Sequence, residues 1–322
     1  MQAKILSALK AAPDYLSGEA LSEQLGITRS AVWKHIVKLK EEGYRIDSVR
    51  NRGYKLLSSP DLLDAERITQ ALDGYHIAHP IITLRTVDST NEELKRQARQ
   101  GAVSGLVVTA EEQTAGKGRF GRQWCAGHDG GLYFSLLLRP DLPPADIASI
   151  TLASGYAVCL AVREFTGLPA QIKWPNDIII GRKKLCGILT EMAAQSDRVD
   201  YVIVGIGINV NNETFPDSIA DKATSLALEA GHPWDRNDFL SCVLRFLEKV
   251  LSNFFVSLSL EDVAHFNTLC ATIGREVTVQ RNGQTISGTA TTVSATGELI
   301  IRTKDNHELT VTSGEVTVQG IY

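Results

Sequence analysis

The sequence lacks a long uninterrupted hydrophobic run. Its longest apolar stretch, residues 147–162, is broken by Ser149, Thr151, Ser154 and Gly155. That stretch falls short of the roughly 20 apolar residues that a helix needs to cross a bilayer. The first residues also have too little apolar length for a signal peptide. We therefore expect a cytoplasmic protein without a membrane segment.

Cysteine is scarce and irregularly spaced. The five cysteines, an odd number, are far apart and form no C-x-x-C pair: Cys125, Cys159, Cys186, Cys242 and Cys270. This spacing argues against a disulfide framework and against a structural zinc site. We expect free thiols, a reducing compartment and no metal site built from protein ligands.

The chain also lacks an excess of charge of either sign. It has 33 Lys and Arg against 37 Asp and Glu over 322 residues, a formal net charge of −4, which excludes a protein that binds DNA along its whole length. The charge is nevertheless uneven. Residues 1–58 hold ten basic and six acidic residues, a local +4, and leave −8 for the rest. Such asymmetry indicates a module for a polyanion on an acidic body.

The amino-terminal module, residues 1–60, has the pattern of a winged helix-turn-helix. Ser17 and Thr28 are placed to cap two short helices, and Gly26 separates them. A basic turn, Arg50-Asn51-Arg52-Gly53, then joins two alternating segments as a wing. The residues expected to face DNA are Thr28, Arg29, Ser30, Trp33, Lys34, Lys38, Arg50 and Arg52. The alternative is a three-helix packing module, or one that binds protein.

The rest of the chain predicts two further domains, as its length allows. We expect a linker over residues 61–80, which follows Pro60 and contains a short helix after Asp64. Residues 81–271 alternate between strand and helix patterns, which indicates an α/β-layered domain. Residues 272–322 are rich in β-branched residues and contain turns such as Asn282-Gly283, so we expect a small β-barrel. The fold class is α+β multidomain.

One segment of the central domain combines glycines with cations. Gly116-Lys117-Gly118-Arg119-Phe120-Gly121-Arg122 holds three of each within seven positions. Glycine lets a backbone approach a ligand closely, and the cations neutralise phosphate or carboxylate. The spacing matches neither a P-loop nor a dinucleotide-binding fingerprint. The alternative is a basic surface turn.

Four other segments are too polar or too rich in glycine for an ordinary core. They are Asp88–Asn91, Lys173–Asp177, Lys184–Leu189 and Gly205–Val210. Asp88–Asn91 alone would be read as a helix cap, and Lys184 alone as either a positioned cation or a solvated turn residue.

Taken in order, the five segments resemble the biotin protein ligases: D-S-T-N, Q-T-A-G-K-G-R-F-G-R-Q-W, K-W-P-N-D, K-L-C-G-I-L and G-I-G-I-N-V. With the winged module in front, the whole chain resembles the bifunctional bacterial biotin ligase and biotin-operon repressors. The resemblance implies a class II synthetase-like ligase domain and an SH3-like carboxyl-terminal barrel. It also implies formation of biotinyl-5′-AMP from biotin and ATP, followed by transfer to a carrier lysine.

The resemblance assigns roles to particular residues. The catalytic positions are Lys184, Arg119 and Asp177. Biotin-binding positions are Ser89, Thr90, Asn91, Gln113, Lys117, Gly118, Arg119, Lys184 and Gly187. ATP or adenylate positions are Gly116, Lys117, Arg119, Arg122, Trp124, Lys173, Asn176 and Asn209. Lys117 stands where the more familiar family motif has arginine, so the charge is kept but the bidentate guanidinium is lost.

The resemblance further implies Mg²⁺, a biotin carboxyl carrier protein of acetyl-CoA carboxylase as acceptor, biotin operator DNA, and a homodimer when adenylate is bound. Two alternatives stay open. One is a lipoate-type ligase of related fold, and the other is a ligand-sensing repressor without catalytic activity.

Overall fold

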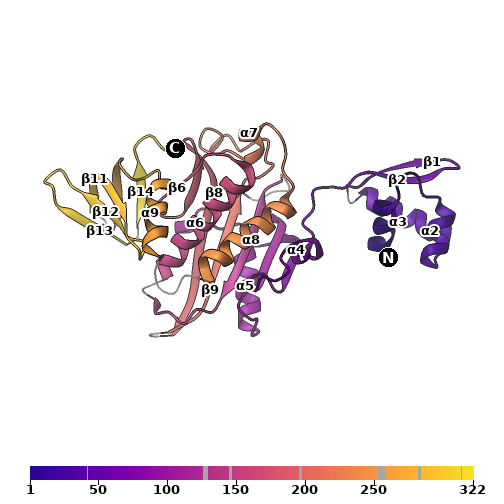
Figure 1. The fold of residues 1–322 in the computed structure, drawn as a ribbon, viewed down its shortest axis with the longest axis horizontal. Coiled ribbons are helices and arrows are strands. Elements are labelled where there is room, and N and C mark those ends of the chain that lie inside the picture. Colours follow the sequence, from indigo (N-terminus) through magenta and orange to yellow (C-terminus); the bar gives the residue numbers. More distant parts are fainter. Residues whose placement is uncertain are drawn as a thin grey trace. The chain divides into compact units, whose positions relative to one another are not determined.

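The computed structural model describes residues 1–41, 43–125, 130–144, 147–195, 198–252, 258–281, 284–312 and 314–322. The chain divides into two compact units, Met1–Leu62 and Leu63–Tyr322 (Figure 1). Each unit has a hydrophobic core of its own.

The first unit consists of three helices followed by a hairpin. Its elements are α1 (Gln2–Ala11), α2 (Gly18–Leu25), α3 (Arg29–Glu41), β1 (Arg45–Val49) and β2 (Gly53–Ser58). Ser17 accepts a hydrogen bond from the backbone N–H of Ala20 at 3.0 Å and so caps α2. Gly26 ends that helix with φ +65°, a conformation that glycine adopts at little cost. The predicted helix-turn-helix with its β-hairpin is confirmed.

The second unit is built on a seven-stranded sheet in the order β3-β4-β5-β9-β8-β7-β6. Its strands are β3 (Ile81–Val87), β4 (Val107–Gln113), β5 (Leu132–Leu138), β6 (Ala170–Lys173), β7 (Asp177–Ile180), β8 (Lys183–Gln195) and β9 (Arg198–Ile208). β3 and β4 are parallel, and the other neighbours are antiparallel.

Helices cover both faces of this sheet because alternate residues of its strands are apolar on both faces. In β4, Val107 belongs to the main core with α6 (Ile147–Thr166) and α8 (Arg236–Ser252). Its neighbour Val108 packs instead with Leu94 of α5 (Thr90–Arg99). Successive side chains of a strand point to opposite faces, so α5 and the α6–α8 pair lie on opposite sides (Figure 1).

Helix α6 is long and apolar enough to span a membrane by length and composition, but 72% of that window is buried inside the unit. It packs on α8 and on the strands. Its hydrophobicity is therefore that of a core helix.

The stretch expected as a linker, residues 61–80, is mostly part of the second unit. It contains α4 (Ala65–Ala71), capped by Asp64, and it buries Ile68 and Leu72 completely. The short helix after Asp64 was expected from the sequence. Its packing on the core of the second unit, which stabilises so short a helix, was not. The second unit also contains α7 (Leu226–Ala230) and α9 (Leu260–Leu269).

The carboxyl-terminal strands form a separate five-stranded antiparallel sheet in the order β13-β12-β11-β10-β14. They are β10 (Glu276–Arg281), β11 (Gln284–Val293), β12 (Leu299–Arg302), β13 (Glu308–Val311) and β14 (Glu315–Val318). Over the described residues no pairing joins β13 to β14, so the closed SH3-like barrel is not confirmed. The expected turn at Asn282-Gly283 lies outside the described residues.

A buried ion pair joins distant parts of the second unit. Arg236 donates to Glu111 at 2.8 Å and to the Gly131 carbonyl at 2.8 Å. The other Glu111 oxygen accepts from the Leu63 N–H at 2.7 Å. The side chains of the pair are only 4% and 9% exposed, so each charge is stabilised by its partner rather than by water.

We expect Arg236→Met to destabilise the second unit by about 3–5 kcal/mol, because it leaves the Glu111 carboxylate buried without its cation. Urea denaturation followed by circular dichroism measures this loss. Arg67→Met is the matched control, since Arg67 pairs with Asp235 and Asp238 at the surface, where such pairs contribute at most about 1 kcal/mol. Equal losses for the two variants would contradict the assignment.

Candidate active site and DNA-binding surface

A cavity of about 390 Å³ opens where the ends of several strands of the second unit meet. The sequence-predicted residues that line it are Ser89, Thr90, Asn91, Gln113, Lys117, Gly118, Arg119, Arg122, Trp124, Lys173, Asn176, Asp177, Lys184 and Gly187. The five segments singled out from the sequence therefore converge on one site.

The start of α5 forms one wall of this cavity. Ser89, Thr90 and Asn91 are almost fully buried. Gln113 accepts from the backbone N–H and the hydroxyl of Thr90, at 2.8 and 3.1 Å. The Ser135 hydroxyl lies within hydrogen-bond distance of the Thr90 hydroxyl and of Asn91 Oδ1, at 2.7 and 2.6 Å. Ser89 makes no side-chain cap of its own helix. Hydrogen bonds among Thr90, Asn91, Gln113 and Ser135 thus hold this wall in one arrangement.

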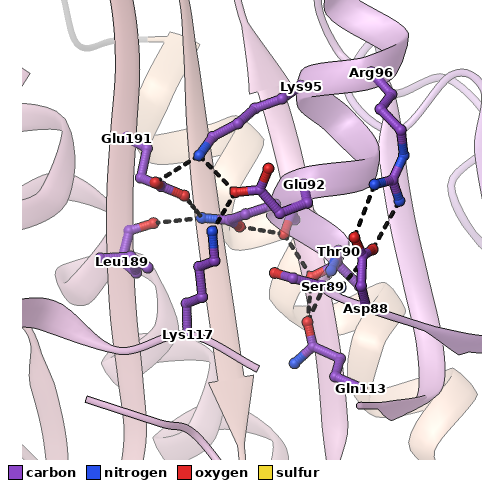
Figure 2. A network of polar contacts seen from close by, with 12 residues as sticks. Asp88, Ser89, Thr90, Glu92, Lys95, Arg96, Gln113, Lys117, Leu189 and Glu191 are labelled. Carbon is purple, nitrogen blue, oxygen red and sulfur yellow. Dashed lines mark hydrogen bonds and ion pairs between the residues drawn. The ribbon is translucent and has the colours of Figure 1, made fainter. Parts of the chain in front are cut away.

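Charged side chains of alternating sign continue this wall (Figure 2). Lys117 lies 2.5 Å from Glu92, which also pairs with Lys95 at 2.8 Å. Lys95 lies 2.7 Å from Glu191, and Glu191 accepts from the Asn91 amide at 2.8 Å. The two lysines lower the pKa of Glu92. Lys117 is thus bound to α5 by a single carboxylate contact, which a compact ammonium can make.

Asp88 is held next to this wall by Arg96. The guanidinium donates to both carboxylate oxygens at 2.7–2.8 Å (Figure 2). This pairing, with a smaller contribution from the Ser89 N–H, lowers the pKa of Asp88 to about 2. Asp88 thus stays ionised at neutral pH and fixes the entry of α5.

The glycine-rich loop folds back on itself as a narrow turn. Gly118 donates to the Arg122 carbonyl at 2.7 Å, and Trp124 donates to the Gly116 carbonyl at 3.0 Å. At its tip the Arg119 guanidinium donates to the Asn176 side chain at 2.8 Å and to the Gly314 carbonyl at 3.1 Å. The loop is therefore tied both to the β6–β7 turn and to the carboxyl-terminal sheet.

Lys184 and Asp177 face each other across the β7–β8 pair. The Lys184 Nζ lies 2.7 Å from Asp177 Oδ1 and 5.5 Å from the centroid of the Trp124 ring. Tyr322 donates its hydroxyl to the second oxygen, Asp177 Oδ2. Asp177 is thus contacted at both oxygens.

Glycines make the floor of the cavity. A Cβ at Gly205 would lie 2.2 Å from Asn91 Oδ1, and one at Gly207 would lie 2.6 Å from Trp124 Cε2. Gly187 pairs with Gly207 across β8 and β9, and its Cβ would also approach Trp124, at 3.0 Å. Any larger residue would displace these neighbours.

Two predicted residues do not line the cavity. The Gly116 carbonyl accepts a hydrogen bond from the Trp124 N–H. Asn209 is buried and donates to the Thr224 carbonyl at 3.0 Å; Thr224 and Lys184 are joined by a 2.9 Å backbone bond. Asn209 thus supports the segment beside Lys184, and its adenine contact stays a prediction.

Other lining residues lie inside the five segments but were given no individual role: Phe120, Gln123, Trp174, Pro175, Ile188, Leu189, Gly205, Ile206 and Gly207. Sequence reasoning missed Lys222, Val316, Thr317 and Tyr322. Val316, Thr317 and Tyr322 come from the carboxyl-terminal segment and carry no motif.

The described lining residues include six cations, Lys117, Arg119, Arg122, Lys173, Lys184 and Lys222, but one carboxylate, Asp177. Such a site can hold two anions together and stabilise charge that develops between them. Over the same part of the chain no group of three His, Cys, Asp or Glu side chains is placed to hold a metal ion. Cys186 is fully buried, which raises its thiol pKa, so it packs rather than reacts.

In the first unit, the eight residues predicted to face DNA are all exposed: Thr28, Arg29, Ser30, Trp33, Lys34, Lys38, Arg50 and Arg52. Two contacts position Arg52: its guanidinium lies 4.2 Å from the centroid of the Tyr15 ring and 3.1 Å from the Asp14 carboxylate. The face of α3 and the hairpin turn thus present polar and basic groups to solvent, as a DNA-binding surface requires.

Comparison with known families divides the chain in the same way. Residues 83–209 match the biotin/lipoate A/B protein ligase family, residues 2–55 match an HTH domain, and residues 272–318 match a biotin protein ligase C terminal domain.

Individual relatives agree with these matches. The bifunctional ligase/repressor BirA of Bacillus subtilis (strain 168) is 36% identical over 298 residues, 92% of each chain. That of Escherichia coli (strain K12) is 33% identical over 249 residues, 77% of this chain and 76% of its own. Among solved structures, the biotin protein ligase from Aquifex aeolicus in complex with biotin and ATP is 34% identical with a TM-score of 0.65. It is matched over 74% of this chain and 98% of its own.

We expect Gly207→Ala to push the Trp124 indole off the cavity floor, because the new methyl would lie 2.6 Å from the ring. Acrylamide quenching of tryptophan fluorescence measures the exposure of the ring, with Trp124→Phe identifying its share of the emission. The fold should persist, with a loss of about 1–3 kcal/mol.

Gly155→Ala is the matched control. Its Cβ would meet Ile188 at 3.7 Å, an ordinary contact, and alanine favours the helix. Quenching of Gly207→Ala that equals the parent protein would refute the role of the glycine floor.

Proposed function

The chain belongs to the biotin protein ligase family, in the group of bifunctional ligase/repressors, and on that premise we propose a two-part function. The second unit joins biotin to ATP as biotinyl-5′-AMP and passes the biotinyl group to a lysine of a biotin carboxyl carrier protein. The first unit binds operator DNA and represses transcription with the adenylate as corepressor. The observation that carries the proposal is the cation-rich cavity beside a buried polar wall.

The first step brings two anions together. A carboxylate oxygen of biotin attacks the α-phosphorus of ATP, the bond to the β-phosphate oxygen breaks, and pyrophosphate leaves. Coulomb repulsion opposes this approach. Lys184, Arg119 and Lys117 are the cations that we propose to offset it, with the loop glycines giving N–H donors to the phosphates.

In the second step the neutral amine of the acceptor lysine attacks the acyl carbon of the mixed anhydride. The bond between that carbon and the phosphate oxygen breaks, and AMP leaves. Asp177 is the carboxylate placed to take the amine proton, and the loop around Arg119 shields the anhydride from water. The proposed head-group contacts are Ser89, Thr90 and Gln113, with Asn91 positioned through Glu191 and Ser135.

We propose that Mg²⁺ enters with ATP. Asp177 is the one carboxylate among the described lining residues, and Lys184 already pairs with it. Phosphate oxygens and water would therefore supply most of the ligands, which suits this ion. The remaining proposals are a cytoplasmic protein, consistent with its five free cysteines, and a homodimer that reads a two-fold operator.

The ligase proposal is tested by exchange of labelled pyrophosphate into ATP. We expect exchange with biotin and none with lipoate, and transfer of labelled biotin to a carrier domain. Arg119→Ala should fold but release biotinyl-5′-AMP about tenfold faster, because a charged donor is lost from the loop.

Arg198→Ala, an exposed arginine at the start of β9 outside the cavity, is the control and should behave as the parent. Exchange with lipoate instead of biotin would favour a lipoate ligase. Absence of both exchange and transfer would favour a sensor without catalytic activity.

The repressor proposal is tested by binding to the promoter fragment of biotin biosynthesis genes with the protein alone, with biotin, and with biotin plus ATP. Binding should be tightest in the third case. The logarithm of the association constant should fall steeply with the logarithm of the salt concentration.

The double variant Arg29→Ala/Lys34→Ala should reduce the slope of this log–log plot by about two per subunit, because each lost cation removes about one phosphate contact. Lys4→Ala, at an exposed position on α1, is the matched control and should leave it unchanged. A flat response to salt in the parent protein would overturn the DNA-binding proposal.

A further inference from the structure

Tyr322 contributes a side chain to the cavity from outside every recognised motif. It follows β14, and the chain beneath it is anchored by the buried Ile321. The Tyr322 N–H donates to the Arg182 carbonyl at 3.2 Å. The residue is thus fixed at the β7–β8 turn, where Arg182 lies two residues before Lys184 in the chain.

The hydroxyl and the ring of Tyr322 contact different charged groups. The hydroxyl donates to Asp177 Oδ2. The ring lies beneath Lys173, whose Nζ is 3.7 Å from the ring centroid, and a cation at this distance is attracted by the face of the ring. Lys173 is 8% exposed, so this contact is largely shielded from water.

The hydroxyl contact affects Lys184 through Asp177. The Lys184 ammonium lies 2.7 Å from Asp177 Oδ1, the distance of a charge-assisted contact. The hydrogen bond from Tyr322 on the opposite oxygen restrains rotation of the carboxylate. It thereby fixes the direction in which Oδ1 attracts the Lys184 ammonium.

We propose that Tyr322 is a positioning residue of the ligase: its hydroxyl orients the Asp177 carboxylate and thereby sets the position of Lys184. This inference rests on the ligase activity proposed above. Although Tyr322 is 37% exposed as a residue, desolvation of its hydroxyl and the neighbouring Asp177 charge raise the pKa of Tyr322 above its usual range, so the hydroxyl is a donor at neutral pH.

The test is a double-mutant cycle on pyrophosphate exchange and on biotin transfer with Tyr322→Phe, Asp177→Asn and the pair. Tyr322→Phe keeps the ring over Lys173 and removes the hydroxyl alone. We expect it to lower kcat of exchange about tenfold, the effect of one hydrogen bond to a charged group, with KM for biotin within about twofold.

In the Asp177→Asn background the same change should have little further effect, because the hydroxyl acts through that carboxylate. Tyr75→Phe, at an exposed tyrosine outside the cavity, is the control for loss of a hydroxyl. Melting temperatures of all variants separate loss of fold from loss of position.

The outcomes distinguish the two proposals. If the parent protein shows no biotin-dependent exchange, the ligase proposal fails. If the parent is active, then full activity of Tyr322→Phe, or losses that add independently to those of Asp177→Asn, overturns the positioning role of Tyr322.

Discussion

The absence of side chains on the cavity floor is the constraint on which the rest of the site depends. Gly205 and Gly207 lie two residues apart on β9, so they share one face of the sheet. Ile206 and Ile208 between and beside them point into the main core. One strand therefore packs tightly on one side and offers bare backbone on the other. Asn91 and Trp124 can approach only because of that bare surface.

Two cations of the site are paired with carboxylates. Lys117 is paired with Glu92 and Lys184 with Asp177. Each pair fixes a long flexible side chain, but the carboxylate also competes with an incoming anion for the same ammonium. A ligand carboxylate or phosphate that binds one of these ammonium groups must therefore displace the protein carboxylate from it. The site thus favours ligands that carry several negative charges.

The motifs allowed the site to be predicted because each one lies at a strand end or in a turn beside the sheet. The sequence could not reveal the partners that meet there from far away. Arg119 binds the Gly314 carbonyl, and any residue at that position would supply a carbonyl, so no residue type marks it. Tyr322 likewise forms no pattern with Asp177. The barrel was expected from turn residues and β-branched residues, which predict strands but not the pairing that closes a sheet.

The carboxyl-terminal sheet, with Gly314, Val316 and Tyr322 at the cavity, has a genetic consequence. It belongs to a different compact unit from α3, which presents the groups for DNA. A substitution at Val316 or Tyr322 that impairs adenylate formation would therefore leave the DNA-binding module folded. Because the adenylate is also the proposed corepressor, such an allele would weaken repression as well as biotin attachment.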